Sequence, residues 1–242
     1  MILQLDKLVP GDMIIMLVSS NLFKKSSKSR KVRCEICANY CKIADGAYGI
    51  CKQHKNITDK MTFHVMIIPT LGCQCNCKYC WGSESTKEMM DISVIDDIIT
   101  WLKDFRDDKV HFTFHGGEPL LAGYDFYAEA LEKLSKIDNL EGFSLQSNIW
   151  LLSDELIDLF LKYNVAVSTS IDGPEEINDY QRAEGYFKKT IGRYERAKEK
   201  GLNINFVLTV TQYSKDYSDE LYEFFKSHGM NLKIHAALPS LR

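Results

Sequence analysis

The chain has 242 residues, 45% of them hydrophobic, so it is long enough to bury a substantial core without disulfide staples. Its formal net charge of −3 excludes an overall positive field that would hold it on nucleic acid. The apolar run at residues 13–18 is too short for a secretory signal or a membrane-spanning helix, so we expect a cytoplasmic protein without a membrane partner.

A basic segment at residues 24–33 combines lysines and arginines with serines and contains no aromatic residue. This composition is typical of a solvated linker rather than of a site for an acidic partner. All eight cysteines of the chain come after this basic segment, between positions 34 and 80. We therefore divide the chain into an N-terminal segment with this linker (1–33), a cysteine-rich metal-binding element (34–59) and a core domain (60–242).

The first cysteine group has the spacing C-x2-C-x3-C-x9-C and consists of Cys34, Cys37, Cys41 and Cys51. Four thiols on a short segment with glycines can enclose one metal centre. The spacing fits either a structural zinc ion or a [4Fe–4S] cluster that relays electrons, with the cluster slightly favoured. A buried set of cysteines without a metal is the third interpretation.

From residue 64 onward, short β-branched and aromatic runs alternate with longer segments of helical periodicity. The predicted strands are 64–70, 109–115, 142–147, 165–171, 203–210 and 232–236, and the predicted helices lie near 92–106, 123–137, 153–163, 185–200 and 216–228. Six strands alternating with five helices indicate an α/β fold with a parallel sheet and right-handed crossovers, either open or an incomplete barrel.

Unusual residues follow the predicted strands where each one ends. A cysteine-rich loop follows the first strand, "GGEP" at 116–119 follows the second, and "QSN", "SIDGP" and "TQ" close the next three. Ligands and catalytic groups of parallel α/β folds gather at the carboxyl ends of the strands. We therefore expect the active site at this edge, with Gln146 and Asn148 as further lining candidates.

The loop after the first strand contains Cys73, Cys77 and Cys80 in the spacing C-x3-C-x2-C. Three thiolates can hold three irons of a [4Fe–4S] cluster and leave the fourth iron open to a small molecule. Zinc usually takes two separate C-x2-C pairs, so the single pair argues against it. The loop resembles that of the radical S-adenosylmethionine (radical SAM) enzymes.

The resemblance implies a partial (β/α)6 barrel of the TIM type, in which the open iron chelates the amino and carboxylate groups of S-adenosylmethionine. In that family, an electron from the cluster cleaves the cofactor, and the 5′-deoxyadenosyl radical then takes a hydrogen atom from the substrate. The same resemblance places Tyr79 beside the adenine. Cys75 departs from the family pattern, and we expect it to be a bystander, since a fourth thiolate would block the open iron.

Two further motifs agree with this family. Gly116, Gly117, Glu118 and Pro119 resemble its cofactor-binding motif, in which the glycines allow close backbone approach, and Glu118 or a nearby carbonyl accepts from the cofactor's ammonium. The segment 170–182 resembles the peptide-modifying branch that includes anaerobic sulfatase-maturating enzymes. It implies that Ser170 faces the ribose and that Arg182 pairs with a carboxylate of cofactor or substrate.

The sequence therefore predicts an oxidoreductase that modifies a peptide or protein and receives electrons from a low-potential donor such as ferredoxin or flavodoxin. Two other functions stay open. An activating enzyme that places a radical on a glycine of a partner protein would share every motif, and the N-terminal cysteine spacing resembles proteins similar to such activators. A non-catalytic zinc-binding interaction module would bind zinc at both cysteine groups, and it would have no need of the "GGEP" motif.

Overall fold

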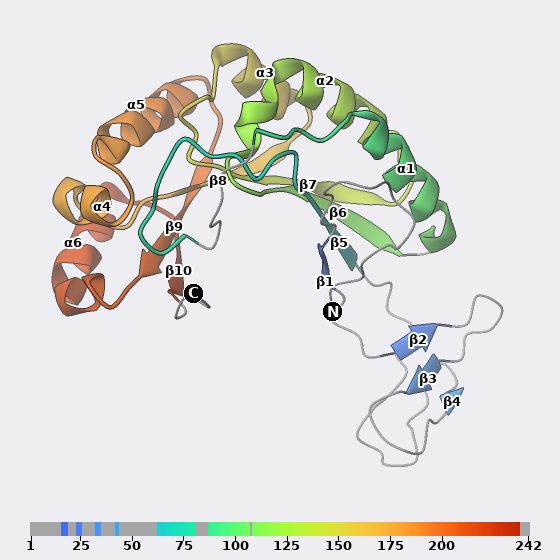
Figure 1. Ribbon diagram of the computed structural model, residues 1–242, viewed down its shortest axis with the longest axis horizontal. Helices are drawn as coiled ribbons and strands as arrows, with labels where there is room; N and C mark the ends of the chain where they lie inside the picture. Colours follow the sequence, from blue (N-terminus) through green and yellow to red (C-terminus); the bar gives the residue numbers. More distant parts are fainter. Residues whose placement is uncertain are drawn as a thin grey trace.

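The structure is a computed structural model that describes residues 62–80, 87–106 and 108–237, preceded by four short strands. These strands are β1 (Met16–Val18), β2 (Phe23–Lys25), β3 (Val32–Cys34) and β4 (Lys42–Ile43). Strands β2, β3 and β4 form a small antiparallel sheet of their own, whereas β1 joins the main sheet (Figure 1).

Six parallel strands form the main sheet in the order in which they occur along the chain. They are β5 (Thr62–Ile67), β6 (Lys109–Phe114), β7 (Leu140–Gln146), β8 (Val165–Ser170), β9 (Ile204–Val210) and β10 (Leu232–Ala236). The strand order without reversal confirms the predicted parallel α/β fold. Figure 1 shows the sheet curving into a half-barrel, which is the partial TIM-type barrel that the sequence predicted.

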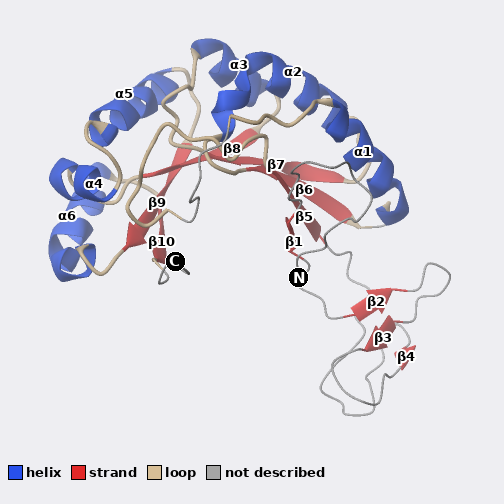
Figure 2. Cartoon of the chain, in the orientation of Figure 1, coloured by secondary structure: helices blue, strands red, loops and turns tan. Residues whose placement is uncertain are grey.

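The helices cover one face of the curved sheet, its convex side (Figure 2). They are α1 (Ser93–Leu102), α2 (Gly123–Leu134), α3 (Asp154–Lys162), α4 (Glu175–Gln181), α5 (Tyr186–Glu199) and α6 (Ser218–His228). None of the helices in the described residues is both long and apolar enough to cross a bilayer.

Strand alternation separates an apolar layer from a polar one. On β6, Val110, Phe112 and Phe114 are at most 1% exposed and belong to the core that packs against the helices. The residues between them face the concave side, where the Thr113 hydroxyl lies 2.8 Å from that of Ser144 on β7. The concave face is therefore polar, and the helices leave it uncovered.

The sequence prediction missed helix α4 and the four short strands β1 to β4. Strand β1 pairs antiparallel with β5, Met16 opposite Met66, and its three residues are too few to show a strand pattern. Helix α4 has only seven residues and follows Pro174, so it is too short for its periodicity to be recognised. The predicted first strand also differs: it ends at Ile67 rather than at 70, since the chain turns there to pack against the loop after β6.

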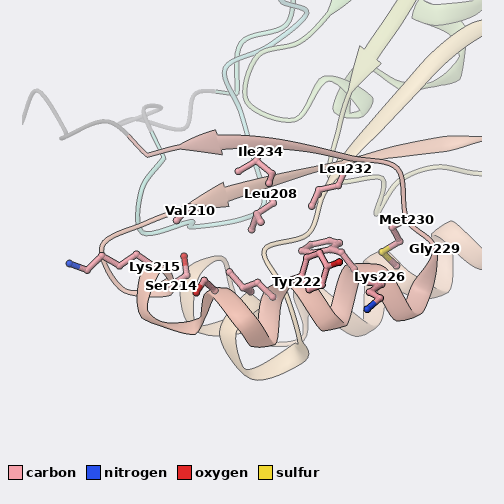
Figure 3. Close-up of a pocket in the computed structure, with 13 residues that line it drawn as sticks. Leu208, Val210, Ser214, Lys215, Tyr222, Lys226, Gly229, Met230, Leu232 and Ile234 are labelled. Atoms are coloured by element: carbon pink, nitrogen blue, oxygen red, sulfur yellow. The ribbon is translucent and has the colours of Figure 1, made fainter.

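An apolar pocket of about 390 Å³ lies between α6 and the outer face of β9 and β10 (Figure 3). Leu208 and Tyr222 contribute to its lining, together with Ile234, which is 63% exposed. Among the described strands β10 is the edge of the sheet, so its outer apolar residues have neighbours on one side only.

Candidate active site

The cysteine loop, residues 68–80, leaves the carboxyl end of β5 and is held at its beginning by the turn after β6. The amide of Gly117 donates to the carbonyl of Thr70 over 3.0 Å, and the amide of Glu118 donates to the carbonyl of Gly72 over 2.7 Å. The "GGEP" turn and the cysteine loop thus form one backbone-bonded unit at the carboxyl edge, where the sequence predicted the site.

Gly116 and Gly117 are required by this contact between two backbones. Gly116 has φ +126°, and a Cβ there would lie 2.5 Å from the Thr70 carbonyl oxygen. A Cβ at Gly117 would lie 2.2 Å from the carbonyl oxygen of Gly72. The sequence suggested that these glycines let backbone approach the cofactor, and in the described residues what they let approach is the backbone of the cysteine loop.

We expect Gly117→Ala to push the cysteine loop away from the turn. Overpacking of this kind typically costs about 1–3 kcal/mol, and the free energy of unfolding should fall by about that amount. After anaerobic reconstitution, the iron content per chain should fall with it. The matched control is Gly142→Ala, whose Cβ would meet the His111 ring at an ordinary 3.6 Å. Equal iron content in the two variants would contradict this account of Gly117.

Glu118 is 1% exposed and makes its hydrogen bonds within the chain. Its carboxylate accepts from the hydroxyl of Ser147 over 2.7 Å and from the amides of Leu120 and Asn148 over 2.9 and 2.8 Å. Burial raises the pKa of Glu118 to about 7, and these three donors act against that shift. Glu118 therefore joins the ends of β6 and β7, while Pro119 begins the 3-10 helix Pro119–Ala122.

The far end of the cysteine loop is held by α4. The amide of Lys78 donates to the carbonyl of Gln181 over 2.8 Å, and the hydroxyl of Tyr79 donates to the carboxylate of Asp172 over 2.6 Å. Asp172 lies just beyond β8, 93 positions from Tyr79 in the sequence. The loop is thus anchored on both sides of Cys73, Cys75 and Cys77, and Cys80 follows the second anchor directly.

Asp172 is fully buried and is the centre of this second anchor. It accepts a hydrogen bond from a terminal nitrogen of the Arg182 guanidinium over 3.0 Å and from the amide of Thr209 on β9 over 2.9 Å, and its other oxygen forms an ion pair with Nε of Arg182 at 2.8 Å. The guanidinium also lies 5.4 Å from the centre of the Tyr79 ring. The structure pairs Arg182 with a carboxylate of its own chain, whereas the sequence suggested one from cofactor or substrate.

Three thiols lie between the two anchors, those of Cys73, Cys75 and Cys77, and they are half-buried; Cys80 directly follows the second anchor and is exposed. A hydrogen bond from Cys75 lowers the pKa of Cys73 to about 6, while the same interaction raises that of Cys75. Burial raises the pKa of Cys77 to about 11, against the opposing effect of the nearby Arg182 charge. Cys75 therefore stays protonated beside a Cys73 thiolate, which is compatible with the predicted bystander.

Asn148, at the end of β7, contacts the same loop through its side-chain amide. Its nitrogen lies 3.4 Å from the sulfur of Cys75, and its oxygen accepts from the side chain of Gln74 over 3.3 Å. On the next strand, the hydroxyl of Ser170 accepts from Gln146 over 3.1 Å. Gln146, Asn148 and Ser170 thus lie together at the carboxyl edge. The role of Asp172 as an anchor was missed by the sequence analysis, which gave this residue no function.

The donor set fits an iron–sulfur cluster. Within the described ranges, no three His, Cys, Asp or Glu side chains are arranged around a single metal ion. A cubane cluster makes a different demand, because each thiolate binds a different iron. Cys73, Cys77 and Cys80 on one loop meet that demand in number and type. The side chains of the predicted second site, Cys34, Cys37, Cys41 and Cys51, lie outside the described residues.

Comparison with known proteins supports this interpretation. The relatives include an uncharacterized protein of Methanothermobacter thermautotrophicus, 47% identical over 75% of this chain and 70% of the relative. They also include the serine-type anaerobic sulfatase-maturating enzyme of Bacteroides thetaiotaomicron, 31% identical over 67% of this chain and 43% of that enzyme. The chain therefore spans less than half of the length of that maturase.

Solved structures agree with the sequence relatives. Native anSMEcpe with bound AdoMet and Cp18Cys peptide has a TM-score of 0.67 and 26% identity, covering 74% of this chain and 52% of that one. Streptococcus suis SuiB bound to its precursor peptide SuiA shares the fold, with a TM-score of 0.56, 15% identity, and coverage of 75% and 40%.

The family model described as "Radical SAM superfamily" matches residues 67–225, which run from the end of β5 into α6 and include both anchors of the cysteine loop. Enzymes of this superfamily use a [4Fe–4S] cluster and S-adenosylmethionine, and AdoMet is bound in solved relatives. The match excludes the zinc-binding interaction module as an account of the core domain. The chain belongs to the radical SAM superfamily of enzymes.

Proposed function

We propose that the chain is a peptide-modifying radical SAM enzyme whose cluster is held by Cys73, Cys77 and Cys80. When bound, the cluster supplies the electron that splits S-adenosylmethionine into methionine and a 5′-deoxyadenosyl radical, which takes a hydrogen atom from a peptide or protein side chain. The observation that carries the proposal is the three-thiol loop itself, anchored from both ends at the carboxyl edge of a half-barrel.

The residues around that loop divide into two groups in this proposal. Glu118, Asp172 and Arg182 hold the loop in place, since Asp172 and Arg182 form a buried ion pair and the buried Glu118 carboxyl accepts three hydrogen bonds within the chain. Ser170 lies on the concave side of the sheet and keeps its proposed place at the ribose. Tyr79 keeps its place beside the adenine, and a backbone group of the 116–119 turn receives the ammonium, because the Glu118 carboxylate already has three donors.

A peptide substrate is supported by the relatives rather than by a bound molecule. Relatives in sequence are named sulfatase-maturating enzymes, and a related structure holds the peptide Cp18Cys. The concave face of the half-barrel is polar and free of helices, which suits a hydrophilic chain approaching the radical (Figure 2). In the same proposal, the N-terminal cysteines hold a second cluster or zinc, and a low-potential protein supplies electrons.

The proposal is tested by following deuterium from substrate to cofactor. Proteins and small molecules from deuterium-grown cells of the source organism are separated, and each fraction is incubated with reconstituted enzyme, S-adenosylmethionine and dithionite. We expect mass spectrometry to find deuterium in 5′-deoxyadenosine with the protein fraction. Transfer from the small-molecule fraction alone would contradict a peptide substrate. A stable radical on an acceptor protein would identify the glycyl-radical activator instead.

A further inference from the structure

A cationic pocket lies directly beside the cysteine loop, on the outer rim of the half-barrel. Its volume is about 520 Å³, and its lining includes Gln74 from the loop, Trp150 from beyond β7, and Lys188, Lys189 and Arg193 from α5. We call it the Trp150 pocket. Gln74 stands between Cys73 and Cys75, so a molecule in this pocket touches the neighbour of a proposed iron ligand.

The pocket has a rigid floor. The indole nitrogen of Trp150 donates to the hydroxyl of Thr190 over 3.0 Å, and Thr190 is fully buried in α5. The ammonium of Lys189 lies 4.4 Å from the centre of the Trp150 ring. Gln74 is tied to the same region through Asn148, which also accepts from the Trp150 amide over 3.0 Å. The cysteine loop and the pocket floor thus share one hydrogen-bonded support.

The charges of the pocket are of one sign. No aspartate or glutamate belongs to its lining. Lys188 is paired with Glu175 at 2.9 Å, but neither Lys189 nor Arg193 has an ion pair with a carboxylate of the described residues. Arg193 acts on Asp154 at longer range, but the ion pairs of Asp154 are with Arg196 and Lys200, so both pocket cations are left without a direct ion pair on a protein whose net charge is −3. Such a local field attracts an acidic partner and fixes its orientation.

The position of the pocket favours a partner other than the substrate. The three cations belong to α5, which covers the convex side of the sheet (Figure 2), whereas the proposed function has the peptide approach from the concave side. A protein that donates electrons must bring its own cofactor close to the cluster without blocking the concave side, where the substrate approaches. The rim beside Gln74 offers such a position.

We infer that the Trp150 pocket is the docking site for an acidic low-potential electron-transfer protein of the flavodoxin or ferredoxin class. The inference rests on the proposed function, because only a site that consumes electrons needs this partner. One electron passes from the reduced donor, which is oxidised by one equivalent, and no atom or proton is transferred. Lys189 and Arg193 pair with carboxylates of the donor, and Trp150 contributes apolar contact area.

The test measures the binding of the donor directly, and it compares product formation with two different reductants. The pocket variant is Lys189→Glu with Arg193→Glu, and the control is Lys136→Glu with Lys162→Glu, which makes the same change in charge just after α2 and at the end of α3. Binding of a purified flavodoxin is measured by titration calorimetry at low salt. Formation of 5′-deoxyadenosine is measured with photoreduced flavodoxin and, separately, with dithionite, which needs no docking site.

We expect the pocket variant to bind flavodoxin at least about tenfold more weakly and to lose flavodoxin-driven product in proportion, since reversing charges at a complementary interface affects both encounter and affinity. Its dithionite-driven product should stay within about twofold of wild type, and the control variant should match wild type in every assay. Added salt should reduce the difference in flavodoxin binding between the pocket variant and wild type by screening the charges.

Unchanged flavodoxin binding in the pocket variant, or an equal loss of binding in the control, would overturn the inference. Failure of the proposed function would appear differently, as no dithionite-driven product in the wild-type enzyme.

Discussion

Cys77→Ala is expected to abolish formation of 5′-deoxyadenosine from S-adenosylmethionine and dithionite. Changes outside the direct ligands of a metal commonly cost 10- to 100-fold in affinity or activity, so loss of a ligand should exceed about 100-fold. Cys77 is the middle thiol of the three and lies between the two anchors of the loop. Cys73→Ala and Cys80→Ala should behave in the same way, with iron content falling in each variant.

Cys75→Ala is the matched control, since it removes a thiol from the same loop. In the structure this thiol acts as a hydrogen-bond partner of Cys73 and of Asn148. Its loss should leave most of the iron and at least about a tenth of the activity, the smaller cost typical of an outer contact. Activity that survives Cys77→Ala but disappears with Cys75→Ala would mean that the ligands have been assigned wrongly.

Asp172→Asn is expected to destabilise the protein by about 3–5 kcal/mol, because it leaves the buried Arg182 guanidinium without its counter-charge. Asp172 is 0% and Arg182 7% exposed, so water cannot replace the lost carboxylate. The same change weakens the acceptor of the Tyr79 hydroxyl, and the far end of the cysteine loop should loosen with it. Urea unfolding under anaerobic conditions measures the first effect, and iron content measures the second.

Two controls distinguish the stability lost with the buried Asp172–Arg182 ion pair from the effect of removing any carboxylate charge. Glu132→Gln breaks the exposed pair with Lys136, and it should cost less than about 1 kcal/mol, as surface pairs do. The double variant Asp172→Asn with Arg182→Met should be more stable than Asp172→Asn alone, since the unpaired charge is removed together with its partner. A single variant as stable as Glu132→Gln would show that the ion pair does not hold this end of the loop.

The repeating part of the fold could be predicted from the sequence because local patterns determine it. The alternation of Val110, Phe112 and Phe114 with polar neighbours is a strand signal, and Ser153 ahead of α3 is a residue type that commonly caps a helix, as it does here by accepting from the Leu156 amide. The three cysteines Cys73, Cys77 and Cys80 likewise lie within one short loop, so their spacing can be recognised in the sequence. Features of this kind depend on neighbours in the sequence, which is why they were recognised.

The anchors of the loop could not be predicted, since they join residues far apart in the sequence. Tyr79 meets Asp172 only once the sheet has curved, and the motif "SIDGP" alone indicates a turn. Glu118 was expected at the cofactor for its chemistry, but its burial and its two donors from beyond β7, Ser147 and Asn148, emerge only when β6 packs beside β7. Long-range closure and burial are properties of the folded chain.

The most direct test of the central claim is the electron paramagnetic resonance spectrum of the reduced wild-type enzyme, recorded before and after addition of S-adenosylmethionine. The protein is reconstituted anaerobically with iron and sulfide. We predict the signal of a reduced [4Fe–4S] cluster whose g values shift when the cofactor binds, because one iron carries no protein thiolate. A protein without such a signal, or a signal that S-adenosylmethionine leaves unchanged, would contradict the assignment of Cys73, Cys77 and Cys80.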